Sequence, residues 1–228
     1  MKEITVCGNG PSVRTMHVER MPRPLWACNA FYRDHEVDVL VAVDPAMQHE
    51  VSRSRRGNHH PTFFRSWSEL PAAVYESIVT DGTVENYRGD CERFVAQGTN
   101  DGRSYITWVN DFDSKYINTI PEEFDTWGSG TTAVRMACEI EAPNVVHLFG
   151  MDMEGQSVYS GTKNVPVYDH DEPFAEWEQQ HLQNFQDFPT IDFIYYGKRV
   201  PESWRDLPNV FEGWDGAFSR RGFAREIS

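Results

Sequence analysis

Residues 3–12 read EITVCGNGPS, a short apolar run that ends in a turn bracketed by two glycines. The run at 3–7 predicts a β-strand. Gly8 and Gly10 have no Cβ, so the backbone can come close to a ligand, and Pro11 with Ser12 suits the start of a helix, where N–H groups attract anions. The stretch therefore predicts either a phosphate-binding turn or a plain structural turn between a strand and a helix.

Short apolar runs alternate with helical patterns along the rest of the chain. The predicted strands are 3–7, 25–28, 38–43, 104–108, 144–149 and 191–196. The predicted helices are 12–20, 45–55, 69–78, 129–142 and 173–186. This alternation predicts an α/β fold, a single Rossmann-like domain over residues 1–228 with a mostly parallel sheet and helices on both faces.

Two segments fall outside this alternation. Residues 80–103 are polar and rich in turn residues, and we expect surface excursions there. Residues 154–172 are irregular and lie between a predicted strand and a predicted helix. Because long irregular loops inside a compact domain are usually functional, we expect a lid or insert at 154–172.

The composition excludes some classes of partner. The chain has 35 acidic against 21 basic residues and a formal net charge of −14, which argues against nucleic acid. No apolar run approaches the roughly 18 residues that a membrane span needs. The cysteines, Cys7, Cys28, Cys91 and Cys138, show no C-x-x-C spacing and indicate buried free thiols. We therefore expect a cytoplasmic, acidic protein, with homo-oligomerisation left open.

Small and polar residues follow the predicted strands, where open α/β sheets bind ligands. They are Gly8, Asn9, Gly10 and Ser12 after the first strand, Asn29 after the second, Asp44 after the third, Ser129 and Gly130 before the 129–142 helix, and Gly150, Met151 and Asp152 after the next strand. Each has a local alternative, such as an Asx-turn at Asn29 or a helix cap at Asp44. Together they predict a nucleotide site.

In their order and spacing these residues resemble the bacterial sialyltransferases related to those of Campylobacter lipooligosaccharide synthesis. They are also similar to the MptE-like 6-hydroxymethylpterin diphosphokinases, which share the G-x-G-P-S and G-x-D signatures. The resemblance covers roughly residues 3–196. It implies a nucleotide-binding Rossmann-like domain and, for the sialyltransferases, a transferase that takes a CMP-type nucleotide sugar as donor and a glycan or small molecule as acceptor, with no tightly bound cofactor.

The resemblance to the sialyltransferases also implies roles for individual residues. Asn9 and Asn29 would contact the nucleotide phosphate and ribose, Ser129 and Gly130 would hold the nucleotide, and Gly150 through Met153 would line the base. His170, near the end of the 154–172 lid, matches the general base, and an imidazole can accept a sugar hydroxyl proton near neutral pH. Tyr159 and Tyr168 are left to steady the departing phosphate. His181 is the rival histidine, and its position suggests surface or core.

Two positions depart from the sialyltransferase pattern. Glu154 stands where that family has a tyrosine, and Asp44-Pro45 stands where it has Asn-Pro. A carboxylate repels a phosphate unless a cation lies between them or the carboxylate binds ribose hydroxyls. Asp44, with Asp152, therefore keeps open an Mg²⁺-dependent diphosphokinase, and a non-catalytic nucleotide-binding protein is a third alternative. Asp111-Phe112-Asp113 matches the D-x-D of metal-dependent glycosyltransferases, or is a solvated loop.

Overall fold

The computed structural model describes residues 1–54, 56, 59–65, 67–69, 94–100, 103–109, 116–165, 167, 174–197 and 199–213. The chain divides into two compact units. The first unit comprises Met1–Asp38 and Gly130–Ser228, and the second comprises Val39–Ser129. The organisation of residues 1–228 as a single domain stays a prediction.

The first unit contains five parallel strands in the order β11-β10-β9-β1-β2. They are β1 (Glu3–Cys7), β2 (Leu25–Cys28), β9 (Val145–Phe149), β10 (Asp192–Tyr195) and β11 (Val210–Glu212). β1 pairs on both sides, with β2 and β9, so its residues from Ile4 to Cys7 are all buried. A central parallel strand covered on both faces reads as a continuous apolar run, which is why the sequence predicted β1 correctly. β11, only three residues long, was not predicted.

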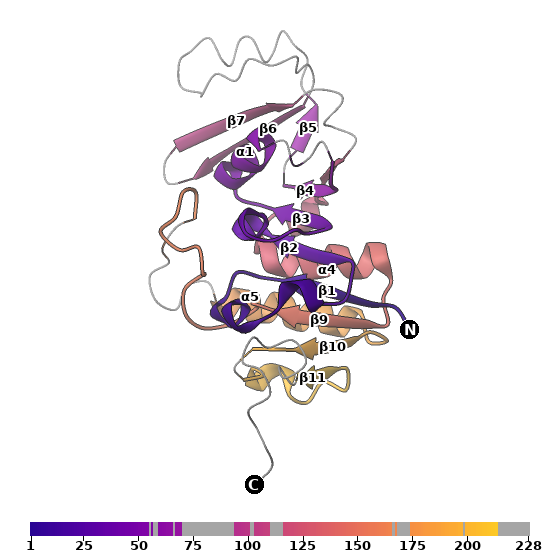
Figure 1. The fold of residues 1–228 in the computed structure, drawn as a ribbon. Helices are drawn as coiled ribbons and strands as arrows, with labels where there is room; N and C mark the ends of the chain where they lie inside the picture. Colours follow the sequence, from indigo (N-terminus) through magenta and orange to yellow (C-terminus); the bar gives the residue numbers. More distant parts are fainter. Residues whose placement is uncertain are drawn as a thin grey trace. The chain divides into compact units, whose positions relative to one another are not determined.

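Two long helices accompany these strands. They are α4 (Ser129–Glu141), which belongs to the first unit apart from its first residue, and α5 (Phe174–Asp187). Their contact includes hydrogen bonds from the Thr131 hydroxyl to the Gln180 side chain at 2.6 Å and from the Asn184 amide to the Thr131 carbonyl at 3.0 Å. Both helices lie behind the strands in Figure 1, whereas the 3₁₀ segments after β1 lie in front. The α/β class is thus confirmed.

The predicted α-helix over 12–20 is wrong. The structure has two 3₁₀ helices there, η1 (Pro11–Thr15) and η2 (Val18–Arg20), separated by Met16 and His17. Met16 has an extended conformation with φ −99° and ψ 148°. The Thr15 hydroxyl donates to the Ser12 carbonyl at 2.8 Å, and such local side-chain bonds compete with a continuing helix. Further 3₁₀ helices are η3 (Asn29–Arg33) and η6 (Glu202–Trp204).

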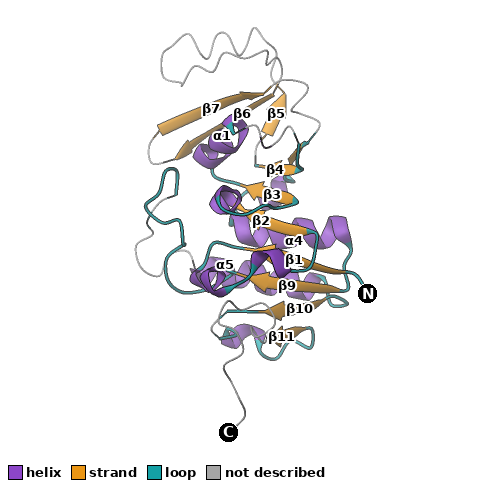
Figure 2. Ribbon diagram, viewed as in Figure 1, coloured by secondary structure: helices purple, strands orange, loops and turns teal. Residues whose placement is uncertain are grey.

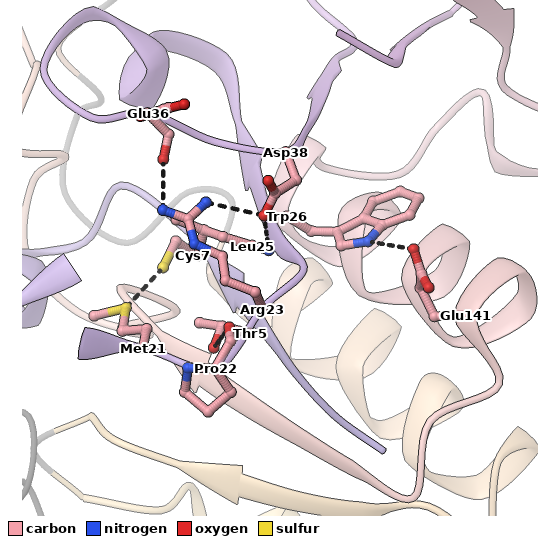
Figure 3. Close-up of polar contacts among 10 residues, drawn as sticks. All are labelled: Thr5, Cys7, Met21, Pro22, Arg23, Leu25, Trp26, Glu36, Asp38 and Glu141. Atoms are coloured by element: carbon pink, nitrogen blue, oxygen red, sulfur yellow. Dashed lines mark hydrogen bonds and ion pairs between the residues drawn. The ribbon is translucent and has the colours of Figure 1, made fainter. Parts of the chain in front are cut away.

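Polar side chains hold the start of β2 in the first unit (Figure 3). The Asp38 carboxylate accepts a hydrogen bond from the Leu25 backbone N–H at 2.7 Å and pairs with the Arg23 guanidinium at 2.9 Å. The same guanidinium donates to the Glu36 backbone carbonyl at 3.3 Å. On the other side of β2, the Trp26 indole donates to Glu141 of α4 at 3.3 Å. These contacts fix β2, and therefore Asn29 directly after it.

The second unit contains three parallel strands, β3 (Val39–Ala42), β4 (Thr62–Phe64) and β8 (Ile117–Thr119), with α1 (Pro45–Arg53) and the 3₁₀ helix η5 (Glu122–Phe124). It also contains an antiparallel sheet of β5 (Trp67–Glu69), β6 (Phe94–Asn100) and β7 (Arg103–Val109), as Figure 2 shows. The sequence missed β4 and β8, which are three residues each.

The antiparallel sheet corrects two expectations. Residues 94–100 were expected to be a surface excursion and form β6, and the strand predicted at 104–108 pairs antiparallel with β6. The pairing runs from Phe94 with Val109 to Asn100 with Arg103. The predicted helix over 69–78 begins at the last residue of β5, and its remainder lies outside the described residues. The described part of 154–172 contains turns and bends but no helix or strand.

Candidate functional site

Two glycine-containing turns pack against each other where β1 and β9 end. Gly8 N–H donates to the Phe149 carbonyl and Gly10 N–H to the Gly150 carbonyl, both at 2.8 Å. A Cβ on Gly8 would lie 2.3 Å from the Gly150 oxygen, and Gly150 itself has a positive φ of 63°. Because both positions need glycine for this close backbone contact, one role of these glycines is to join the two strand ends.

The Asp152 carboxylate occupies the start of η1. Its Oδ2 accepts hydrogen bonds from the Ser12 backbone N–H at 3.0 Å and from the Ser12 hydroxyl at 2.7 Å. The same hydroxyl accepts a hydrogen bond from Gly150 N–H at 3.0 Å. Burial raises the pKa of Asp152, and the two hydrogen bonds from Ser12 oppose that rise. The N–H expected to meet a phosphate is therefore bonded to a carboxylate of the chain itself.

Asn9 connects this turn to β2 and to the irregular segment. Its side-chain amide donates to the Cys28 carbonyl at 3.2 Å, and its backbone carbonyl accepts from Val158 N–H at 2.7 Å. The amide oxygen is buried and has no hydrogen-bond partner in the described part of the chain. Asn29, directly after Cys28, has a left-handed backbone with φ 49°. Asn9 and Asn29 thus lie at the carboxyl ends of neighbouring strands, as predicted.

Met151 fills the space between two glycines of the predicted site. It is buried, and its sulfur lies 2.8 Å from a Cβ position on Gly8 and 3.0 Å from one on Gly130. Its carbonyl accepts a hydrogen bond from the Tyr195 hydroxyl at 3.2 Å. The structure therefore brings Gly8, Gly130 and Met151 together around one thioether.

The irregular segment is attached to the strand end by side chains that the sequence did not indicate. Tyr159 is buried, and burial together with a hydrogen bond to Asp34 raises the pKa of its hydroxyl. The Arg33 guanidinium donates to the Thr162 hydroxyl at 2.8 Å and to the Lys163 carbonyl at 2.5 Å. Arg33 is the last residue of η3, and Asp34 follows it. No local sequence pattern predicts these contacts, because the partners of Arg33 and Asp34 are more than a hundred residues away.

Two cavities open at the carboxyl ends of β1, β9, β10 and β11. One, of about 620 Å³, is lined by Ser12, Thr15, Tyr196 and neighbouring residues. The other, of about 430 Å³, is lined by Met153, Tyr195, Arg199 and Arg205 among others. Asp152 and Glu154 line both. Asp152 and Met153 thus border solvent-accessible space next to the strand ends.

In the second unit, Asp44 follows β3 and precedes α1, as predicted. Burial lowers the pKa of the Arg65 guanidinium. The negative charges of the Asp44 and Asp125 carboxylates partly oppose this shift. Buried Gln48 of α1 donates to the carbonyls of Ala42 and Arg65, each at 2.9 Å. Arg65 is a cationic partner for Asp44 that sequence reasoning missed, because a single arginine after a short strand carries no signal. Ser129 is the last residue of this unit.

Several candidates lie outside the described residues, namely Tyr168, His170 and the Asp111-Phe112-Asp113 tripeptide. His181 is described: it lies in the core between Phe185 and Trp204, and burial lowers its pKa to about 3. Within the described ranges, no group of three or more His, Cys, Asp or Glu side chains is arranged to hold a metal ion. Cys7, Cys28 and Cys138 are buried free thiols.

Among the solved structures that are similar to this chain are those of two sialyltransferases. The monofunctional α-2,3-sialyltransferase Cst-I from Campylobacter jejuni is 13% identical, over 86% of this chain and 75% of that one, with a TM-score of 0.47. The sialyltransferase CstII from the same organism is 12% identical in its complexes with cytidine-5′-monophosphate and with CMP-3FNeuAc. These cover 94% of this chain and 88% and 89% of theirs, with TM-scores of 0.40 and 0.41. No family model and no curated protein matches the sequence.

Over the described residues, no helix has an apolar stretch long enough to cross a membrane.

Proposed function

We propose that this chain is a glycosyltransferase that uses a nucleotide sugar, similar in type to the bacterial sialyltransferases. One observation carries the proposal: the Gly8–Ser12 turn, Asn29 and the residues from Gly150 to Met153 meet at the carboxyl ends of three adjacent parallel strands, β2, β1 and β9. In open α/β folds this edge is where nucleotides bind. The order of these motifs in the sequence supports a CMP-type donor.

The proposed site divides into groups with different tasks. Asn9 has a buried amide oxygen that can accept a hydrogen bond from a ligand hydroxyl or amino group. Asn29 is held in a left-handed conformation at a strand end, and such strained positions cluster at binding sites. Ser129 and Gly130 open α4, whose first N–H groups favour an anion. Tyr159 is proposed to steady the departing phosphate, together with Tyr168.

In the proposed reaction, His170 is the general base. The acceptor hydroxyl oxygen attacks the anomeric carbon of the donor sugar, and its proton passes to the imidazole. The bond between the anomeric carbon and the phosphate oxygen breaks, and the nucleoside monophosphate leaves with the bonding electrons. An imidazole suits this task because its ordinary pKa, about 6.5, lies near neutral pH.

A thermal-shift panel tests the ligand class. Wild-type protein is heated with CMP, CDP, UDP, GDP or ATP, each without and with Mg²⁺, and the true ligand raises Tm by mass action. CMP binding that does not require Mg²⁺ supports the glycosyltransferase, and the absence of a shift with every nucleotide contradicts it.

A transfer assay then tests the base. CMP-linked sugar donors are incubated with an oligosaccharide panel, and released CMP is measured for wild type, His170→Ala and His59→Ala. His59 is exposed and serves as the matched control. We expect His170→Ala to lower the rate at least a hundredfold and His59→Ala to leave it unchanged. A His170→Ala rate equal to wild type would remove His170 from the mechanism.

The carboxylate of Asp44 favours a second candidate, an Mg²⁺-dependent diphosphokinase acting on a small heterocyclic alcohol, with Asp44 near the metal. The proximity of Arg65 argues for the first candidate, because a guanidinium offsets the charge of Asp44 without a metal. ATP binding that depends on Mg²⁺ in the same panel, lost in Asp44→Asn, would favour the diphosphokinase.

A further inference from the structure

Hydrogen bonds between Ser12 and Asp152 join two strand ends, and the two residues are 140 positions apart in sequence. The Ser12 hydroxyl donates to Asp152 Oδ2 and accepts from Gly150 N–H, so both of its hydrogen-bonding directions are used. The Ser12 backbone N–H donates to the same carboxylate oxygen. Asp152 therefore connects, through one serine, to the backbone of the Gly150 turn two residues before it.

The carboxylate sits where an external anion would be expected. The first N–H groups after a glycine-rich turn attract negative charge, and here Oδ2 of Asp152 lies 3.0 Å from the Ser12 nitrogen. Gly10 lies so close that a Cβ there would be 2.2 Å from the same oxygen. A ligand phosphate could reach this N–H only by displacing Asp152.

We propose that Asp152 is a positioning residue: it serves as the built-in hydrogen-bond acceptor of the Gly8–Ser12 turn and, through Ser12, holds the backbone from Gly150 to Met153 in place. In this role it contacts neither the nucleotide nor a metal ion, and the phosphate of the ligand is held by other groups. The inference rests on the proposed function only where a nucleotide is used as a probe.

Hydrogen exchange tests the proposal without any ligand. Backbone amide exchange is measured by NMR in wild type, Asp152→Ala, Ser12→Ala and Asp152→Asn, with exposed Asp206→Ala as the matched control. We expect the Gly150 amide to exchange about tenfold faster in Asp152→Ala and in Ser12→Ala, because both variants break the hydrogen bonds between the two strand ends. Asp152→Asn should exchange like wild type, because a carboxamide oxygen can accept both hydrogen bonds from Ser12. Unchanged exchange in Asp152→Ala would overturn the proposal.

CMP affinity, measured by titration calorimetry without and with Mg²⁺, separates positioning from direct contact. Asp152→Ala and Ser12→Ala should each weaken binding about tenfold, and the double variant should be no weaker than either, because the two residues act as one unit. Asp152→Asn should bind within twofold of wild type. If Asp152→Asn binds as weakly as Asp152→Ala, the charge itself meets the ligand or a metal, and the proposal is wrong. If wild type binds no CMP, the proposed function fails while the exchange experiment still decides the role of Asp152.

Discussion

Gly10 lies so close to Asp152 that a β-carbon on Gly10 would stand 2.2 Å from the carboxylate oxygen Oδ2 and 2.8 Å from the Gly150 carbonyl oxygen. The glycine pattern at 8–10 predicted either a phosphate-binding turn or a plain structural turn. In the structure, the space beside Gly8 and Gly10 is occupied by the turn that follows β9 and by the Asp152 carboxylate of that turn. The two strand ends therefore behave as one packed unit, and substitutions in either should affect both.

Substitution of Gly10 by alanine should destabilise the fold by about 1–3 kcal/mol, because backbone atoms and a hydrogen-bonded carboxylate must move apart. The free energy of unfolding from urea titration measures this. Gly130→Ala is the control: the atom nearest its Cβ is the flexible Met151 thioether at 3.0 Å, so its effect should stay within about 1 kcal/mol. Equal effects for the two variants would contradict the tight contact at Gly10.

Asp38→Ala should lower the free energy of unfolding by about 1–3 kcal/mol, chiefly because the Leu25 N–H loses its acceptor. The Arg23–Asp38 ion pair contributes little, since its side chains are 42% and 46% exposed. Arg23→Met should therefore cost less than Asp38→Ala. Glu36→Ala is the control, because Glu36 offers Arg23 only its backbone carbonyl, and it should change stability by less than about 0.5 kcal/mol. A larger loss in Arg23→Met than in Asp38→Ala would show that the ion pair dominates.

The substitutions Asn29→Ala and Asn29→Gly separate the effect of the backbone conformation on stability from the effect of the side chain on binding. With φ at 49°, alanine should be about 1 kcal/mol less stable than glycine at this position. Both variants lack the carboxamide, so both should weaken nucleotide binding by a similar factor if that group contacts the ligand. Urea unfolding and CMP titration of the pair measure the two effects. Wild-type affinity in Asn29→Gly would exclude Asn29 from the binding site.

Stability should fall as the pH is lowered below about 6.5, in part because of His181. Burial lowers its pKa to about 3 in the folded protein, whereas the unfolded chain has the ordinary value near 6.5. Between these values the unfolded state binds more protons, so the contribution of His181 to folding is lost at up to about 1.4 kcal/mol per pH unit as pH decreases.

The His181→Gln variant, which does not titrate, should have a shallower dependence of the unfolding free energy on pH between 7 and 4. His59→Ala, at an exposed position, should keep the wild-type slope. Parallel curves for wild type and His181→Gln would contradict the buried, neutral state of His181.

Much of the first unit follows from local sequence. β1 and β2 were predicted to the residue, and β9, β10, α4 and α5 within one or two residues of their ends. The reason is that central parallel strands must be apolar throughout, and helices of 13 or 14 residues carry a clear periodicity. The strands β4, β8 and β11 were not predicted, because three residues are too few to show a pattern of apolar residues.

The candidate site was predictable as a set of strand ends but not as a set of contacts. That Gly8, Asn9 and Asn29 follow strands could be seen in the sequence, since glycine and asparagine favour turns. The roles of His170 and Tyr168 stay predictions. The contacts of Arg33, Asp34 and Arg65 could not be predicted. The sequence shows that these residues are charged or polar, but only the folded structure shows which side chain or carbonyl lies next to each of them.

The turn at residues 8–12 shows the division most clearly. The sequence by itself determined that a buried strand ends at Cys7 and that the following backbone can approach another group closely, because Gly8 and Gly10 have no side chains. Only the tertiary structure decided which group that is. Asp152 comes from the end of β9, and the parallel pairing of β9 with β1 brings its carboxylate to the Ser12 N–H across 140 residues of chain. No local preference encodes that meeting, since it depends on the order of the strands in the sheet.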